Sequence, residues 1–167
     1  MLVAGLPGTG KSALARQLSA QLQGAVVNKD QVRAALFEDR WIEYSVEQDD
    51  FVMGLMLDTA AWLVRKACPF VFLDGRVFAR AYQRDRVHAF AHSIGQSCRI
   101  IECVCEEEIA LERLRRDLRT AMHPARNRDE ALYFRTRDAF EPIPQPKLVV
   151  DTGGAIDLAS LALALSE

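Results

Sequence analysis

Apolar residues in this chain follow two patterns that alternate from one end to the other. The first pattern is a short, mostly apolar run, which occurs at 1–4, 25–27, 70–73, 98–104 and 148–150. The run at 70–73 contains no polar alternation, as is typical of a parallel strand covered on both faces. We therefore expect five strands that are largely buried.

The second pattern places apolar residues three or four positions apart, as on the buried face of a helix. After the first run, Leu14, Leu18 and Leu22 recur at four-residue spacing, and Gly24 is expected to end their helix. Similar stripes predict further helices at about 47–67, 106–119, 129–140 and 158–165. One more helix carries Val87, Phe90, Ala91 and Ile94 and is expected to end before Gly95. Strand and helix thus alternate five times, which predicts an α/β domain with a parallel sheet and right-handed crossovers.

Length and composition favour one domain, 1–167, because 167 residues that are 50% hydrophobic suffice for one buried core. The formal charge of -2 argues against general electrostatic coating of nucleic acid. Four cysteines without a C-x-x-C pair fit reduced core residues of a cytoplasmic protein. No segment approaches the roughly 20 apolar residues of a membrane span, so we expect no membrane partner.

The most specific motif lies between the first run and the first helix. Residues 5–12, Gly-Leu-Pro-Gly-Thr-Gly-Lys-Ser, fit the pattern G-x-x-x-x-G-K-[ST]. In this pattern backbone N–H groups wrap around a phosphate, Lys11 reaches the outer phosphates and the Ser12 hydroxyl can ligate Mg²⁺. A side chain at Gly8 or Gly10 would block the wrap. We predict a nucleoside triphosphate site formed by Gly5, Gly8, Thr9, Gly10, Lys11 and Ser12.

Polar residues follow the predicted strands, at the edge of a parallel sheet where ligands bind. Asp30 comes after the second run, Asp74 directly after the third and Thr152 after the fifth. Asp30 and Asp74 should therefore face the same crevice as the phosphate loop. One carboxylate could deprotonate an attacking hydroxyl and the other could hold Mg²⁺ through water. The alternative for each is a helix cap or a turn residue.

Residues 28–30, Asn-Lys-Asp, share letters with the guanine signature N-K-x-D of GTPases. We reject that interpretation because a base-recognition loop belongs after a late strand and the spacing does not fit. ATP is therefore the expected nucleotide.

Positive charge gathers between Arg113 and Arg137, and we expect an arginine-rich lid at about 113–128. Arg113 and Arg116 lie three positions apart on a predicted helix, share a face and can point at transferring phosphates. Local ion pairs on a solvated face are the simpler explanation for most of the others. These others are Arg115, Arg119, Arg126, Arg128, Arg135 and Arg137.

Two further groups of residues carry weaker signals. His88 and His92 have metal-ligand spacing but no third ligand, so we expect ordinary surface or packing residues. Trp41, Tyr44 and Phe51 either line a substrate pocket or seal the core, and the sequence leaves both open.

With these residues in place, the chain resembles the P-loop kinases related to zeta toxin, chloramphenicol phosphotransferase and the 5′-kinase domain of phage-type polynucleotide kinase. The likeness covers nearly the whole chain and implies sheet order 2-3-1-4-5 with helices on both faces. It implies that Asp30 is the general base, that Arg33 contacts the acceptor, and that Arg113 and Arg116 neutralise the phosphates. Its motifs lie at 5–12, 28–33, 72–75, 112–116, 140–142 and 150–152.

The chain departs from the family pattern at Cys68-Pro69, where relatives often have glycine, and at Arg76, directly after Asp74-Gly75. A guanidinium at Arg76 would suit an anionic or phosphorylated acceptor, although it can equally point to solvent. Asp74 can serve either the metal or the substrate. Thr152 joins the residues expected to bind the nucleotide.

These features predict a kinase that uses ATP and Mg²⁺ to phosphorylate a hydroxyl of a small molecule. A polynucleotide 5′-hydroxyl kinase is the first alternative. A nucleotide-binding ATPase switch without an acceptor is the second.

Overall fold

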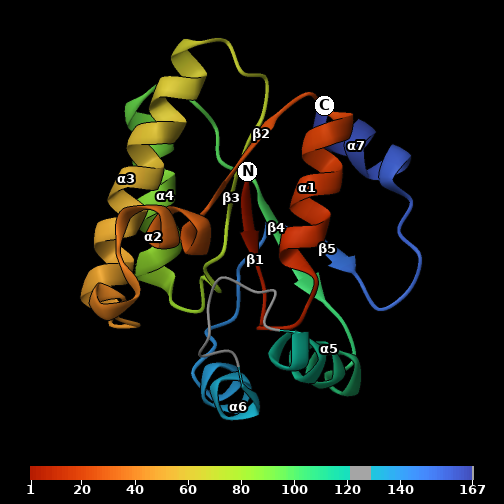
Figure 1. The fold of residues 1–167 in the computed structure, drawn as a ribbon. Coiled ribbons are helices and arrows are strands. Elements are labelled where there is room, and N and C mark those ends of the chain that lie inside the picture. Colours follow the sequence, from red (N-terminus) through yellow and green to blue (C-terminus); the bar gives the residue numbers. More distant parts are fainter. Residues whose placement is uncertain (121–128, 167) are drawn as a thin grey trace.

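The centre of the fold is a five-stranded parallel sheet, seen in a computed structural model that describes residues 1–120 and 129–166 (Figure 1). The strands run in the order β2-β3-β1-β4-β5. This is the order that the family resemblance implied, and the expected α/β class is confirmed. The bounds are β1 Leu2–Ala4, β2 Ala25–Asn28, β3 Val71–Asp74, β4 Ile100–Val104 and β5 Leu148–Asp151.

One face of the sheet is covered by α2 (Lys29–Leu36), α3 (Val46–Arg65) and α4 (Ala81–Ser93), which Figure 1 shows together on the left. Side chains of Leu2 and Ala4 point to this face because they are two apart on a strand. They join Val52, Met56 and Val87 in one buried cluster.

The opposite face is covered by α1 (Lys11–Gln21) and α7 (Leu158–Ser166). Val3, between Leu2 and Ala4, points to this side and packs with Leu14 and Leu18 of the predicted stripe. Both faces of β1 and of most of β3 are therefore buried, which explains why these strands show little polar alternation. The edge strand β5 is less covered than expected, and its Val149 is 51% exposed.

Two helices lie beyond the carboxyl ends of the strands instead of on a face of the sheet, α5 (Glu107–Thr120) and α6 (Glu130–Asp138) (Figure 1). Leu111, Leu114 and Tyr133 form a separate small cluster between them. Leu118, which continues the predicted stripe of α5, is nevertheless 49% exposed.

The structure corrects several boundaries and adds two elements. The strand expected at 98–104 begins at Ile100, and the helix expected at 129–140 is shorter, Glu130–Asp138. The helix at 47–67 ends at Arg65, before Pro69, because Ala67 takes a left-handed conformation (φ 60°) and Cys68 N–H donates back to the Leu63 carbonyl. The sequence pattern did not delimit α2 or the short 3-10 helix Asp39–Trp41. Both are too short for a periodic apolar stripe.

The four cysteines are free thiols, with Cys103 buried and the others half-buried. None of the helices in the described ranges combines the length and the apolar character that crossing a membrane requires.

Candidate functional site

The phosphate loop joins β1 to α1 at the carboxyl edge of the sheet. Gly8 and Gly10 adopt φ angles of 79° and 71°, which only glycine takes without strain. Thr9 closes the loop on itself by donating from Oγ1 to the Leu6 carbonyl at 2.8 Å. The first turn of α1 begins at Lys11, and Gly10 as N-cap offers no side chain to its N–H groups. Those N–H groups and the helix dipole form an anion site.

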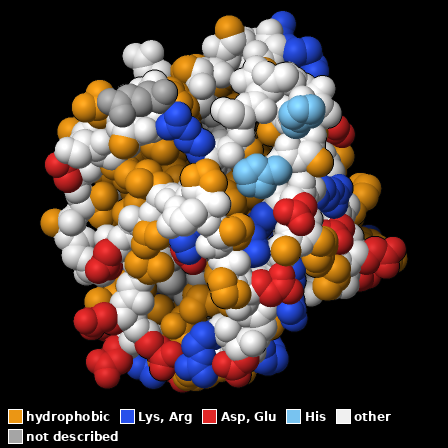
Figure 2. All heavy atoms as spheres, turned by 180° about the vertical axis from the view of Figure 1, so that it is seen from behind, with side chains coloured by type: hydrophobic (Ala, Val, Ile, Leu, Met, Phe, Trp, Pro, Cys, Tyr) orange, Lys and Arg blue, Asp and Glu red, His pale blue; other side chains and the backbone are white. Residues whose placement is uncertain are grey.

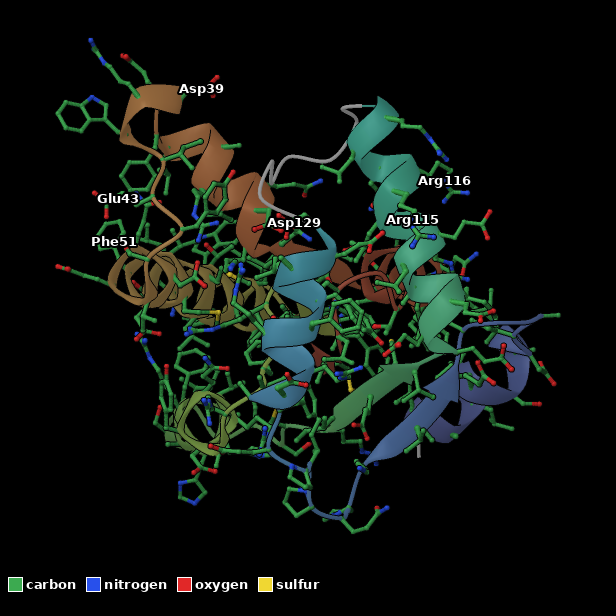
Figure 3. All side chains as sticks on the ribbon, turned by 90° about the horizontal axis from the view of Figure 1, so that it is seen from below. Asp39, Glu43, Phe51, Arg115, Arg116 and Asp129 are labelled. Atoms are coloured by element: carbon green, nitrogen blue, oxygen red, sulfur yellow. The ribbon has the colours of Figure 1, made fainter. Side chains whose placement is uncertain are left out.

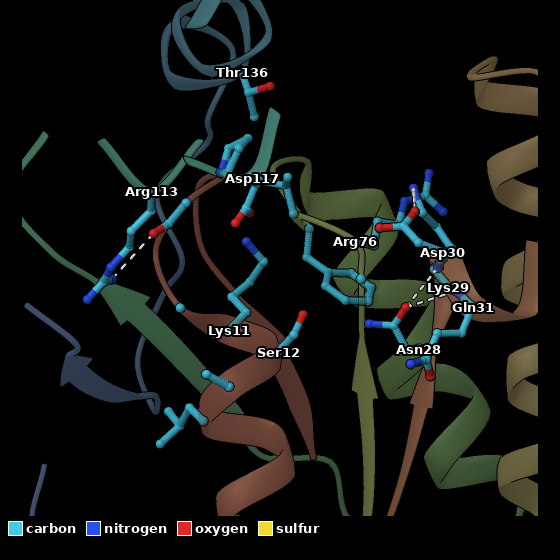
Figure 4. A pocket seen from close by; sticks show the side chains of 18 of the residues that line it. Lys11, Ser12, Asn28, Lys29, Asp30, Gln31, Arg76, Arg113, Asp117 and Thr136 are labelled. Atoms are coloured by element: carbon cyan, nitrogen blue, oxygen red, sulfur yellow. Dashed lines mark hydrogen bonds and ion pairs between the residues drawn. The ribbon is translucent and has the colours of Figure 1, made fainter. Parts of the chain in front are cut away.

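Lys11 and Ser12 both line the cavity in front of this loop. Lys11 is 7% exposed, and its Nζ donates to the Leu6 carbonyl at 2.6 Å. Figure 4 shows Lys11 and Asp117 of α5 pointing toward each other. A cation held at the mouth of the loop is what an incoming phosphate requires.

Thr152 and Arg113 brace the loop from the side of β5. The Thr152 hydroxyl donates to the Thr9 carbonyl at 2.9 Å. Arg113 donates to the Thr152 carbonyl at 2.7 Å and lies 3.4 Å from the Gly8 carbonyl. Thr152 and Arg113 thus line the cavity while fixing the shape of the loop.

Asn28 and Asp74 are partners in the register between β2 and β3, so their side chains meet at the end of the sheet. Asn28 Nδ2 donates to Asp74 Oδ2 at 2.5 Å. Asp74 is completely buried, and its other oxygen, Oδ1, has no hydrogen-bond partner among the described residues. A buried carboxylate oxygen without a donor suits a cation or a water held by one. Ser12 and Asp74 therefore fit a Mg²⁺ ion bound with phosphates.

Asp30 lies in the first turn of α2, on the other side of the cavity from Lys11 (Figure 4). Its Oδ1 is 3.4 Å from Arg33 Nη1 and 3.9 Å from Lys29 Nζ. The main partner of both cations is instead Asp49 of α3, which accepts from Lys29 at 2.9 Å and closely contacts Arg33 Nη2. Asp49 thus engages the two cations, and the second oxygen of Asp30 has no protein partner in the described ranges.

Arg33 is 2% exposed and stacks over the Tyr44 ring at 5.3 Å. Burial lowers the pKa of its guanidinium, and the neighbouring Asp30 opposes that shift. The side chain lines the cavity one helical turn beyond Asp30, the place that the family resemblance gave to an acceptor contact.

Arg76 does not point to solvent, one of the two orientations that the sequence left open. It is 5% exposed, lines the cavity and donates from Nη1 to Asp50 Oδ1 at 2.7 Å. Figure 4 shows it between the phosphate loop and the residues that surround Asp30.

A single cavity of about 830 Å³ joins these two groups of residues. Lys11, Ser12 and Arg116 line one end, and Asp30 and Arg33 line the other. The sequence prediction that strand ends converge on one crevice therefore holds for Asp30, whereas Asp74 lies beneath the cavity and is not part of its lining.

The remaining sequence candidates that the structure describes do not line the cavity. Arg115 pairs with Glu130 at 2.5 Å and Arg137 with Glu107 at 2.8 Å, as expected of solvated arginines. Arg126 and Arg128, with the lid segment 121–128, lie outside the described residues. His88 and His92 are exposed, and histidine side chains, pale blue in Figure 2, lie on the surface. The described residues contain no cluster of three or more potential metal ligands from His, Cys, Asp and Glu.

Of the three aromatic candidates, only Tyr44 lines the cavity, while Trp41 and Phe51 are 62% and 57% exposed. Asp49, Asp50 and Asp117 were not singled out from the sequence. Asp49 occupies the first turn of α3, where an acid is usually explained by the helix dipole. Its second role, as the partner of Lys29 and Arg33, depends on α3 lying against α2 and could be found only in the structure.

Comparison with known proteins supports this fold. A family model described as an AAA domain matches residues 1–142. No curated protein sequence matches the chain. Among solved structures, a Chloroflexus aurantiacus protein provisionally assigned as a kinase is 21% identical, with a TM-score of 0.76 and coverage of 98% of this chain and 95% of that chain.

Two further solved structures were determined with nucleotides. Kti12 of Chaetomium thermophilum in complex with ADP-AlF3 is 15% identical, with a TM-score of 0.69 and coverage of 98% and 95%. The APS kinase CysC of Mycobacterium tuberculosis, in complex with AMPPNP and APS, is 15% identical, with a TM-score of 0.62 and coverage of 98% and 94%. At these identities the likeness establishes the fold, that of the P-loop NTPases.

Proposed function

This chain belongs to the AAA domain family, and on that premise we propose that it is an ATP-dependent kinase acting on a hydroxyl of a small molecule. The observation that carries the proposal is the shared cavity, with the phosphate loop at one end and Asp30 at the other. Phosphoryl transfer requires placement, charge neutralisation and a group that receives the proton of the acceptor. A nucleotide switch has no use for the last of these.

The nucleotide end would hold the ATP phosphates on the N–H groups of the loop and of α1, with Lys11 on the outer phosphates. ATP is favoured because two structures of this fold were solved with adenine nucleotides. Arg116 lines the cavity from α5, as Arg113 does, and would contribute positive charge at the phosphates. Arg113 would support the reaction chiefly through the loop that it braces, unless it exchanges its bonds to Thr152.

Ser12 and Asp74 would hold Mg²⁺, which when bound supplies positive charge at the phosphates. Asn28 occupies Asp74 Oδ2, so Oδ1 is left for this purpose. The same hydrogen bond fixes the direction of the carboxylate, because a buried side chain with a short hydrogen bond has little freedom to rotate.

At the acceptor end, Asp30 would take the proton of the substrate hydroxyl as that oxygen attacks the γ-phosphorus. The bond from the γ-phosphorus to the bridging oxygen breaks, and ADP leaves with that oxygen. Asp49 contributes indirectly, since it engages Lys29 and Arg33, which would otherwise lie against Asp30 alone. The acceptor would also contact Arg33 and Tyr44 in the cavity wall.

A small molecule is favoured over a polynucleotide end by the charges around the acceptor side. Glu38, Asp39, Glu43 and Glu47 are all exposed in the segment that surrounds Tyr44. Figure 3 shows Asp39 and Glu43 on that segment, away from Arg115 and Arg116 on α5. A phosphate backbone entering there would meet like charges, whereas nucleic-acid binding needs a basic track. The unpaired cysteines suit a reducing compartment, and a cytoplasmic location stays a prediction.

Substitution of the proposed base tests the proposal. Asp30→Asn keeps the size of the side chain but cannot accept a proton, so we expect turnover to fall at least about a hundredfold. ATP affinity by calorimetry should stay within about twofold. Acceptors would first be found by screening hydroxyl compounds for ADP release.

The matched control is Asp39→Asn, an exposed acid of the 3-10 helix that does not line the cavity. Its turnover should equal that of the unmodified protein. Unchanged turnover in Asp30→Asn would remove Asp30 from the mechanism. ATP hydrolysis that no acceptor accelerates would instead point to a switch.

A further inference from the structure

Arg76 occupies an unusual position for a charged side chain. It follows β3 and Gly75 directly, is 5% exposed, and still lines the cavity that contains Asp30. Burying a guanidinium is costly unless its N–H groups find acceptors. The position of Arg76 therefore calls for a partner or a ligand.

The protein supplies only part of that partnership. Among the described residues, Arg76 has one hydrogen-bond partner, Asp50, which occupies Nη1. The buried side-chain atoms without a partner in the described ranges are Arg33 Nε and Asp74 Oδ1, and no atom of Arg76 is among them. The other N–H groups of Arg76 are therefore not sealed into the core, and the surface they reach is that of the cavity.

The local charge balance around Arg76 is positive. Asp50 Oδ1 lies 2.7 Å from Arg76 and 3.7 Å from Arg86 Nη1, so one carboxylate faces two guanidinium groups. Lys29 and Arg33, by contrast, are matched in number by Asp30 and Asp49. Within this group of paired side chains, the excess positive charge therefore lies at Asp50, where Arg76 and Arg86 meet.

From this arrangement we infer that Arg76 forms an oxyanion subsite, and that the acceptor carries a phosphate, sulfate or carboxylate group besides the hydroxyl that is phosphorylated. This inference deepens the proposed function and rests on it for the identity of the acceptor. A guanidinium presents N–H groups in a planar fork that matches two oxygens of such a group. Asp50 engages Nη1 and leaves the other N–H groups of Arg76 to the cavity.

The subsite is tested first by oxyanion binding, without turnover. Inorganic sulfate, and separately malonate, are titrated onto the protein saturated with Mg²⁺ and AMPPNP, and the melting temperature is followed. If AMPPNP does not bind, sulfate could occupy the phosphate loop instead of the subsite. The same titration is therefore repeated on Lys11→Gln, in which the phosphate loop is disabled. Because sulfate stabilises proteins in general, the quantity measured is the difference between variants at equal salt.

We expect Arg76→Gln to weaken oxyanion binding at least about tenfold, the usual loss for a charge-assisted hydrogen bond. Asp50→Asn keeps an acceptor for Nη1 but removes the competing negative charge, so binding should become tighter. Arg99→Gln, with the same charge change at the opposite end of the sheet, should behave as the unmodified protein. Arg86 stays near Asp50 in Arg76→Gln and limits any loss of stability.

The second experiment measures ADP release with pairs of candidate acceptors. The two members of a pair are the same hydroxyl compound with and without a phosphate or carboxylate group. The inference is supported if the anionic members of the pairs react and if Arg76→Gln raises their KM more than it lowers their kcat. Neutral members that react equally well overturn it and leave the kinase proposal standing. If nothing reacts but oxyanion binding still depends on Arg76, the subsite stands and the kinase proposal fails. Equal oxyanion titrations in Arg76→Gln and the unmodified protein, or no response in either, overturn the subsite.

Discussion

At the scale of residues, the phosphate loop is constrained from two sides. The sequence pattern explained Gly8 by the close approach of a phosphate. The structure adds that a Cβ at Gly8 would lie 2.4 Å from the Ala110 carbonyl oxygen of α5. Gly8 is therefore required for the shape of the loop and also for the contact between the loop and α5, because any side chain at this position would collide with the Ala110 carbonyl oxygen.

Gly8→Ala should consequently damage folding and nucleotide binding together. The methyl group meets backbone atoms that cannot rotate away, and φ is 79°, so we expect a loss of about 2–4 kcal/mol in the free energy of unfolding. Urea unfolding and calorimetry with Mg-ATP measure the two effects. Gly154→Ala, where an added Cβ meets nothing within 4 Å, is the control, and equal behaviour of the two variants would refute the explanation.

At the scale of elements, one side chain ties the start of α2 to β3. Asn28 Oδ1 accepts from the N–H groups of Asp30 and Gln31 at 3.0 Å, which caps α2. Its Nδ2 donates to Asp74. A single amide therefore links the start of the helix that carries Asp30 to the strand that carries Asp74.

Two substitutions separate the halves of this link. Asn28→Ala removes the cap, worth about 1 kcal/mol, and leaves Asp74 without its donor, worth about 1–3 kcal/mol. Asn28→Ser restores an oxygen for the cap but not the donor, so its unfolding free energy should lie between those of Asn28→Ala and the unmodified protein. Urea unfolding measures the order of the three. Stability of Asn28→Ala equal to that of the unmodified protein would show that neither bond matters.

At the scale of the whole molecule, the helices bury the centre of the sheet so completely that an ionisable group is enclosed as well. Cys103 of β4 is 1% exposed and packs under α1 and α7. Burial raises the pKa of its thiol from 9.0 to about 12. The fold thus holds Cys103 protonated well above the pH at which an unfolded chain would release the proton.

The sign of the resulting pH dependence follows from linkage. Below pH 9 the Cys103 thiol is protonated in both the folded and the unfolded state, and its contribution to stability is complete. Between pH 9 and about 12 only the unfolded state loses the proton, so the free energy of unfolding falls as pH rises. Cys103→Ala should be less stable at neutral pH, because a buried sulfur is lost, but its stability should fall less steeply above pH 9. Urea unfolding near pH 8 and near pH 10.5 gives both slopes, and parallel slopes would contradict the assignment.

Much of the molecule could be predicted from the sequence because its signals are local. The phosphate loop is a contiguous motif, and the strands and helices follow from apolar spacing within single segments. Asp30 could be placed in the cavity because the carboxyl ends of parallel strands meet at one edge. The order of the strands required the family resemblance, since alternation of strand and helix fits several orders.

The sequence by itself therefore determined the α/β class, the position of the phosphate loop and the edge at which the site lies. Only the tertiary structure decided that Asp49 and Asp50 of α3 hold Arg33 and Arg76, that Arg113 binds Thr152, and that Asp74 lies beneath the cavity. These pairs join residues 16, 26 and 39 positions apart. The periodicity of the sequence predicts the face of an element on which a side chain lies. Which partner the side chain meets on that face depends on how the helices pack across the sheet, because that packing decides which charges and hydrogen-bonding groups come together.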